Sequence, residues 1–163
     1  MRPGGHAAWK AARFLAVAVP AALLAAVYVG QYHFDLYPCE MCWWQRYPHF
    51  AAAGLGLLAF GLPGKARALV ALAALAVLVS GLIGAYHAGV EYGWWEGLTA
   101  CTATAVAGAQ DPLKAILDAP LVRCDQVQWE LFGISLAGYN FLVSTAAAVL
   151  IGVLLRRSGG ARR

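Results

Sequence analysis

The chain has 163 residues, of which 61% are hydrophobic and 12% are charged, against roughly 25% charged residues in a typical soluble domain. This composition excludes an ordinary soluble globular domain, and no hydrophilic stretch is long enough to form a separate one. The net charge is +4, but the basic residues gather beside the apolar runs, which indicates membrane topology and not nucleic-acid binding. We therefore expect a single integral membrane domain over residues 1–163.

Four apolar runs predict four transmembrane helices, packed as an all-α bundle. The expected spans cover residues 14–30, 43–62, 68–87 and 131–155. A short outer loop is expected over residues 31–42, a tight basic turn over residues 61–67, and a long outer loop over residues 88–130. A cleaved signal peptide is the alternative for the first run, because a basic segment precedes it. Ser80 and Gly84 give the third run a face of small residues for close helix packing.

Lysine and arginine are distributed unevenly along the chain. Nine of the twelve lie in the two ends of the chain and in the 61–67 turn, whereas all eight acidic residues lie in the two outer loops. The positive-inside rule therefore places both termini and the turn in the cytoplasm. The four cysteines then face the opposite, oxidising side, where they can form two disulfides; they are Cys39, Cys42, Cys101 and Cys124.

The segment Cys39-Glu-Met-Cys42 stands where a polar loop meets the second apolar run. The run from Tyr47 onward is too short to cross the ~30 Å hydrocarbon core, so the helix is expected to begin near Trp43. Cys42 then lies at the helix N-terminus, with Arg46 four residues later on the same face. Such a thiol is expected to have a lowered pKa and to react as a thiolate. An arginine within a span indicates a functional site, although its side chain can also extend to the headgroups.

Redox chemistry is one interpretation of the Cys39/Cys42 motif, and a structural disulfide or half of a zinc site are the others. Cys101 and Cys124 lie far apart in the long loop, which does not match a zinc motif of two closely spaced cysteine pairs. Two pairs on one side of the membrane could exchange disulfides in series. A lipid-soluble quinone fits as the final electron acceptor, whereas the sequence has no Gly-rich phosphate loop for a nicotinamide.

These features together resemble the disulfide bond formation protein B (DsbB) family of bacterial inner-membrane proteins. The resemblance covers nearly the whole chain: four spans, a CxxC motif before the second span, and a cysteine pair in the long outer loop. Two local strings agree with the family pattern. They are Cys39-x-x-Cys42-x-x-Gln45-Arg46 and Cys124-x-x-x-Gln128-Trp129-x-x-x-Gly133.

The resemblance implies a protein-disulfide:quinone oxidoreductase of the inner membrane, with its cysteine loops in the periplasm. Its redox centres would be two disulfides, Cys39–Cys42 and Cys101–Cys124, and its acceptor non-covalently bound ubiquinone or menaquinone. A reduced periplasmic thioredoxin-fold oxidase of the DsbA type would attack Cys101. Cys124 would then exchange with Cys39, and Cys42 would face the quinone. Arg46 would lie beside the quinone and stabilise its developing negative charge.

Other polar residues carry weaker signals. His87 and Glu91 share a helix face level with Cys42, and the resemblance suggests the quinone site for them; an interfacial histidine with an exposed glutamate is the alternative. His49 and Asn140 belong to no recognisable pattern and are expected to be interfacial or interhelical polar residues. Residues 112–120 show helical spacing of apolar side chains and form either a surface helix or an ordinary loop.

Two other functions compete with this interpretation. A vitamin K epoxide reductase-like protein also combines a CxxC motif with a quinone, but in that family the motif follows the other cysteine pair, and here it precedes that pair. A non-enzymatic metal-binding membrane protein with four outer cysteines is the second alternative. Counting thiols separates the two classes, because a zinc site needs thiolates and bound metal, whereas the oxidised enzyme contains disulfides.

Overall fold

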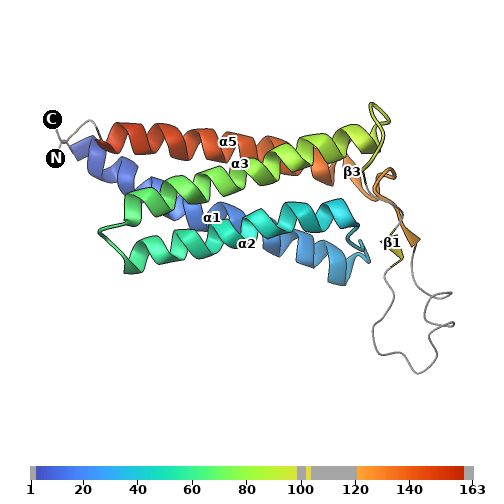
Figure 1. Cartoon of the computed structure of the whole chain (residues 1–163), viewed down its shortest axis with the longest axis horizontal. Coiled ribbons are helices and arrows are strands. Elements are labelled where there is room, and N and C mark those ends of the chain that lie inside the picture. Colours follow the sequence, from blue (N-terminus) through green and yellow to red (C-terminus); the bar gives the residue numbers. More distant parts are fainter. Residues whose placement is uncertain (1–2, 99–101, 104–120, 160–163) are drawn as a thin grey trace, which may run out of the picture.

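The structure is a computed structural model, and it describes residues 3–98, 102–103 and 121–159. Four long helices run side by side in this part of the chain (Figure 1). They are α1 (Pro3–His33), α2 (Glu40–Gly61), α3 (Ala66–Glu91) and α5 (Leu136–Gly159). Both termini and the α2–α3 turn lie at one end of the bundle, and the short strands lie at the other. The expectation of a helical bundle is therefore confirmed.

Two short antiparallel strand pairs occupy the end opposite the termini. Strand β1 (Thr102–Ala103) pairs with β2 (Leu121–Val122), and β3 (Glu130–Leu131) pairs with β4 (Ile134–Ser135). The β3–β4 hairpin turns at Phe132 and Gly133, which both have positive φ, as a two-residue type I′ turn requires.

The fourth helix starts later than the sequence predicted. Residues 131–135, assigned above to the fourth span, form the β3–β4 hairpin, and α5 begins only at Leu136. Ser135 explains this start, because its Oγ accepts the Gly138 N–H at 3.2 Å as an N-cap does. The backbone N–H of Ser135 donates to the Tyr92 hydroxyl at 2.8 Å, which ties the hairpin to the end of α3.

The other helices contain most of the expected spans and extend beyond them at one end or both. Helix α1 begins at Pro3, so much of the basic segment expected as a tail is helical. Helix α2 begins at Glu40, before the predicted start at Trp43. Helix α3 continues to Glu91, beyond the predicted end at His87. The first outer loop is therefore shorter than predicted, whereas the second lies between Glu91 and Leu136 and is shifted toward the C-terminus. Residues 112–120 lie outside the described part, so the surface-helix alternative stays a prediction.

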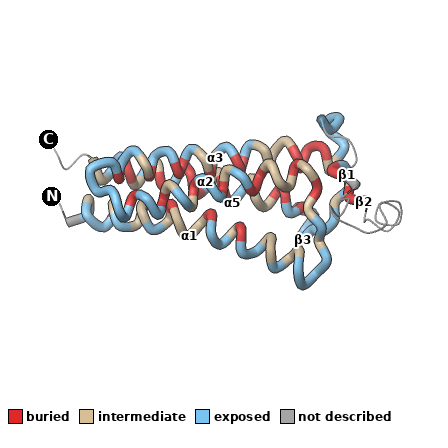
Figure 2. Tube along the Cα trace, turned by 60° about the horizontal axis from the view of Figure 1, so that its bottom comes forward, coloured by how far each residue is buried: buried red, intermediate tan, exposed pale blue. Residues whose placement is uncertain are grey.

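Helices α1, α3 and α5 are long and apolar enough to cross a membrane, which makes the chain a multi-pass membrane protein. Helix α2 is less apolar, because its first turns contain Gln45, Arg46 and His49. These three residues are only 7%, 5% and 4% exposed. Their polar side chains therefore face neighbouring helices. Buried and exposed residues alternate along each helix of the bundle (Figure 2).

Small residues allow the helices to approach closely. A Cβ added at Gly56 of α2 would lie 2.8 Å from the carbonyl oxygen of Ala16 in α1. A Cβ at Gly84 of α3 would lie 2.9 Å from the carbonyl oxygen of Ala137 in α5. Ser80 is fully buried and donates to the carbonyl oxygen of Gln45 at 2.8 Å. The face of small residues predicted for the third span thus packs against two other helices.

Candidate active site

Cys39 and Cys42 lie where α2 begins. Cys39 is the N-cap of the helix, and its Sγ accepts the Cys42 N–H at 3.3 Å. Both are free cysteines with Sγ atoms 2.9 Å apart, so the structure describes the dithiol form of the pair expected to form a disulfide. Cys39 is 1% exposed, and Cys42 is half-buried.

The two sulfur atoms differ in acidity. Hydrogen bonding with the thiols of Cys124 and Cys42, followed by burial, raises the pKa of Cys39 above its ordinary value. Cys42 precedes the expected 43–62 span, and the hydrogen bond from the Cys39 thiol lowers its pKa. The lowered pKa predicted for Cys42 is confirmed in direction, but its main cause is the neighbouring thiol.

Cys124 brings the long loop to the same place. It follows strand β2, is 7% exposed, and packs in one cluster with Cys39, Met41, Val90 and Val122. Its thiol also hydrogen-bonds to that of Cys39. Sulfur atoms from the two loops are therefore in contact. Cys101, the predicted disulfide partner of Cys124, lies outside the described residues.

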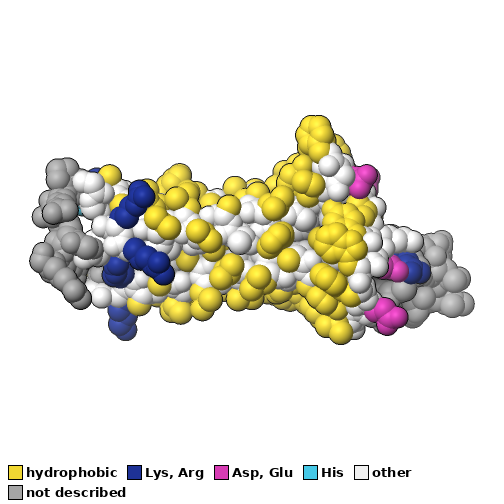
Figure 3. All heavy atoms as spheres, turned by 90° about the horizontal axis from the view of Figure 1, so that it is seen from above, with side chains coloured by type: hydrophobic (Ala, Val, Ile, Leu, Met, Phe, Trp, Pro, Cys, Tyr) yellow, Lys and Arg dark blue, Asp and Glu magenta, His cyan; other side chains and the backbone are white. Residues whose placement is uncertain are grey.

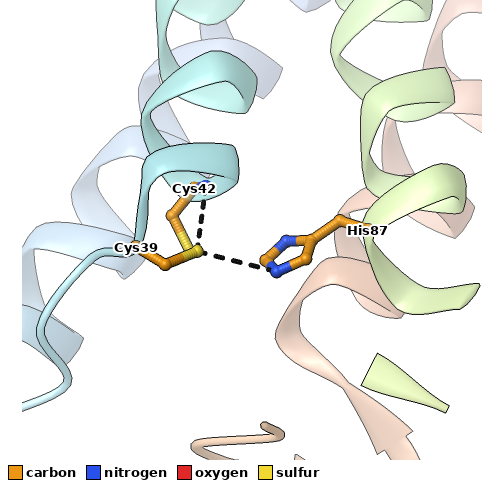
Figure 4. Close-up of side chains that lie close together, drawn as sticks. All are labelled: Cys39, Cys42 and His87. Carbon is orange, nitrogen blue, oxygen red and sulfur yellow. Dashed lines mark hydrogen bonds between the residues drawn. The ribbon is translucent and has the colours of Figure 1, made fainter. Parts of the chain in front are cut away.

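His87 points from α3 toward the dithiol (Figure 4). Its Nε2 lies 3.6 Å from Cys39 Sγ and 3.8 Å from Glu91 Oε1, and its Nδ1 lies 2.8 Å from Gln45 Nε2. The side chains of His87 and Glu91 are 3% and 7% exposed. An interfacial histidine with an exposed glutamate therefore does not describe this pair, and both residues line the site.

Arg46 is held inside the bundle. It is 5% exposed and donates to Gln31 Oε1 of α1 at 2.8 Å. Its guanidinium also lies 5.0 Å from the ring centre of Tyr28 and 4.9 Å from that of Trp43. An arginine that extended to the headgroups would be exposed, so simple interfacial anchoring does not fit. Arg46 and Cys42 line the same pocket, as their common helix face predicted.

This pocket has a volume of about 490 Å³ and lies at the end of the bundle that carries the cysteines. Its apolar wall includes Leu23, Leu24 and Val27 of α1. Its polar lining comprises Cys39, Cys42, Gln45, Arg46, His49, His87, Glu91 and Asn140, with further residues of the loops. A mostly apolar pocket with a few convergent polar groups is typical of a small-molecule site, and this one suits an apolar ring with polar edges.

His49 and Asn140 are interhelical, one of the two expectations for them, and they belong to a polar network whose other members the sequence did not reveal. His49 Nε2 lies 3.0 Å from Asn140 Oδ1, and Asn140 Nδ2 donates to Gln45 Oε1 at 2.8 Å. Gln45 then continues the network to His87. Gln45 and His49 are four residues apart, so their common face was a usable signal. Asn140 comes from α5, and only the tertiary structure shows that it meets them.

A metal site can be tested against the same geometry. The donor atoms of Cys39, Cys42 and His87 lie within 4.8 Å of one another, close enough to hold an ion. A metal at His87 Nε2 would need that atom's lone pair. The Gln45 amide nitrogen lies 2.8 Å from Nδ1 and donates to the Met41 carbonyl oxygen at 3.2 Å, an arrangement that suits a hydrogen on Nε2. This arrangement favours thiol chemistry over metal binding.

Known proteins resemble the chain over most of its length. The family model described as disulfide bond formation protein DsbB matches residues 9–154. A disulfide bond formation protein B of Marinobacter nauticus is 30% identical over 149 residues, covering 85% of this chain and 88% of that protein. The uncharacterized protein RP370 of Rickettsia prowazekii is 21% identical over 151 residues, covering 90% and 88%. No solved structure matches the chain significantly. With both cysteine loops inside the matched region, the chain belongs to the DsbB family of disulfide bond formation oxidoreductases.

Proposed function

We propose that this protein is a protein-disulfide:quinone oxidoreductase. It takes electrons from a periplasmic thioredoxin-fold oxidase of the DsbA type and passes them to a membrane quinone, either ubiquinone or menaquinone. The observation that carries the proposal is that Cys39 and Cys42 line one apolar pocket with Arg46, while Cys124 contacts Cys39. Electrons that enter the long loop can therefore reach the pocket by exchange between neighbouring sulfur atoms.

The proposed exchange step uses the contact between Cys124 and Cys39. The reduced oxidase attacks Cys101 of a Cys101–Cys124 disulfide and frees Cys124 as a thiolate. Cys124 then attacks Cys39 of the Cys39–Cys42 disulfide, so that a Cys124–Cys39 bond forms and Cys42 leaves with the electron pair. The contact between Cys124 and Cys39 supports this step.

The pocket residues suit a quinone as the acceptor. A bound quinone would take up two electrons and two protons and leave as quinol. The apolar α1 wall would hold its ring and tail, and Arg46 would donate charge-assisted hydrogen bonds to a ring oxygen. Since Nη1 of Arg46 already donates to Gln31 Oε1, the guanidinium is oriented before a ligand binds. Cys42 would face the ring from the start of α2.

The proposed orientation has all four helices crossing the inner membrane, with both termini in the cytoplasm and both cysteine loops in the periplasm. Lysine and arginine gather at the end with the termini, and most acidic side chains at the other end (Figure 3). This separation supports the orientation by the positive-inside rule. Helix α2 has 22 residues and is about 33 Å long, which is enough to span the hydrocarbon core.

A coupled assay tests the function directly. The purified protein is mixed with a reduced thioredoxin-fold oxidase and a soluble quinone, while quinone absorbance and free thiols are followed together. We expect one quinone reduced for each dithiol oxidised, and no quinone reduction by Cys42→Ser. Oxidation of thiols without loss of quinone would show that the acceptor is wrongly assigned.

A further inference from the structure

The amide orientations around His87 are fixed by backbone carbonyls. Gln45 Nε2 lies 3.2 Å from the Met41 carbonyl oxygen, which can only accept a hydrogen bond. Asn140 Nδ2 likewise lies 3.1 Å from the Ser80 carbonyl oxygen and donates to Gln45 Oε1 at 2.8 Å. Both contacts place the NH₂ group of Gln45 on the side of His87 Nδ1, 2.8 Å away. His87 Nδ1 is therefore an acceptor.

A neutral imidazole that accepts at Nδ1 carries its hydrogen on Nε2. Three described groups lie beside Nε2, and each of them can accept that hydrogen. Cys39 Sγ lies at 3.6 Å, Glu91 Oε1 at 3.8 Å, and the backbone of Cys124 also hydrogen-bonds to the ring. Nδ1 of the ring thus meets a donor, whereas Nε2 meets acceptors, including the sulfur of one loop and the backbone of the other.

We propose that Gln45 is a positioning residue that keeps the ring hydrogen on His87 Nε2, so that His87 donates to Cys39 Sγ and stabilises the departing Cys39 thiolate when a Cys39–Cys124 disulfide is resolved. This inference rests on the exchange step of the proposed function and deepens it. An incoming thiolate bonds to Cys124 Sγ, the Cys124–Cys39 bond breaks, and Cys39 takes the electron pair. No further oxidant or proton donor is needed.

Burial explains why Cys39 needs a fixed donor. Cys39 is 1% exposed, so water cannot solvate a negative charge on its sulfur. Within the described residues, two non-thiol N–H groups approach this atom: the Cys42 backbone N–H at 3.3 Å and His87 Nε2 at 3.6 Å. With the hydrogen on Nδ1 instead, the lone pair of Nε2 would face the thiolate and repel it. The same tautomer prevents His87 from taking the proton of Cys39.

Nitrogen NMR tests the tautomer without any assay of activity. The dithiol protein is labelled with ¹⁵N-histidine in detergent, and His87→Gln identifies the His87 signals among the four histidines. We expect the hydrogen on Nε2 in the unaltered protein. In Gln45→Glu, which places a carboxylate acceptor opposite Nδ1, a hydrogen should appear on Nδ1. An Nδ1-bound hydrogen in the unaltered protein, or an unchanged spectrum in Gln45→Glu, would overturn the proposal.

A kinetic test uses neither quinone nor the partner oxidase, so its failure is distinct from failure of the proposed function. A Cys42→Ser, Cys101→Ser background leaves Cys39 and Cys124 to form one disulfide, whose reduction by dithiothreitol is timed. Gln45→Met and His87→Gln should each slow reduction roughly 10-fold or more, as expected for a lost hydrogen bond to a charged group. The two changes combined should slow it no further, because they act through one hydrogen bond.

Ser144→Ala is the matched control for the kinetic test. Ser144 donates to Asn140 Oδ1 at 2.8 Å, and in the described part of the chain it makes no hydrogen bond to Gln45 or His87. Its loss should leave the rate of reduction unchanged. Additive effects of Gln45→Met and His87→Gln, or equal slowing by Ser144→Ala, would mean that Gln45 acts only through packing.

Discussion

Arg46 is the most informative single residue, because its burial separates two explanations of a charge in a membrane helix. Gln31, Tyr28 and Trp43 surround its guanidinium at the pocket wall. Burying a cation there costs free energy, so a charged residue at this depth indicates a functional role. Its position beside Cys42 is what a residue that binds the acceptor would need.

Arg46→Met keeps the length of the side chain but removes its charge and donors. We expect slower quinone reduction and a higher quinone concentration for half-maximal rate. A hydrogen bond to a charged group contributes ~1.5–3 kcal/mol, so its loss should change these quantities by roughly 10- to 150-fold. Quinone titrations measure this. Arg13→Met is the control, since Arg13 also packs on aromatic rings, Trp9 and Phe60, but is not among the residues that line the pocket. Unchanged turnover in Arg46→Met at every quinone concentration would leave Arg46 as a structural residue.

The roles of the long-loop cysteines can be separated by trapping. In Cys124→Ser, Cys101 loses its resolving partner and should accumulate a stable mixed disulfide with the soluble oxidase. In Cys101→Ser the adduct should not form, because Cys124 is buried against Cys39. Non-reducing gels of the two variants measure the adduct. The opposite pattern would exchange the roles of the two residues.

At the scale of the helices, packing depends on positions where a neighbouring backbone leaves no room for a side chain. Gly56 is such a position: an added Cβ would lie 2.7 Å from Val17 Cγ2 and 2.8 Å from the Ala16 carbonyl oxygen. Gly54, on the same helix, has nothing within 4 Å of an added Cβ. The two glycines therefore allow the same substitution to be compared at two positions of one helix that differ in packing.

Gly56→Ala should destabilise the bundle by about 1–3 kcal/mol, because α1 and α2 must move apart to admit the methyl group. Gly54→Ala should be neutral or more stable by about 0.5–1 kcal/mol, since alanine is the better helix former. Denaturant unfolding in detergent, followed by circular dichroism, compares the two. Equal stability of both variants would contradict the close α1–α2 approach.

At the scale of the whole molecule, the orientation in the membrane can be tested with introduced cysteines. Lys65 immediately precedes α3 and Glu96 follows its end, so these two exposed residues lie beyond opposite ends of that helix. In a background with all four native cysteines replaced by serine, a membrane-impermeant maleimide should label Glu96→Cys in intact cells. It should label Lys65→Cys only after lysis. Labelling in the reverse order would invert the proposed topology.

The sequence alone determined the helical class, the approximate spans, the common face of Cys42 and Arg46, and the resemblance to the DsbB family. These depend on local properties: the length of an apolar run, the end of the run at which basic residues lie, and the spacing of residues on one helix. It misplaced the start of the fourth helix because residues 131–135 continue an apolar run. The hairpin turn at Gly133 and the helix cap at Ser135 interrupt that run, so α5 begins only after them.

The tertiary structure alone decided which distant residues meet. Cys124 reaches Cys39 because β2 and the segment after it return the long loop to the start of α2. Gln45, His87, Asn140 and His49 join one network because α2, α3 and α5 turn their polar faces toward one another. Local sequence patterns do not predict how one helix is rotated about its axis relative to its neighbours. The ring hydrogen of His87, which follows from that rotation, could therefore be assigned only from the folded bundle.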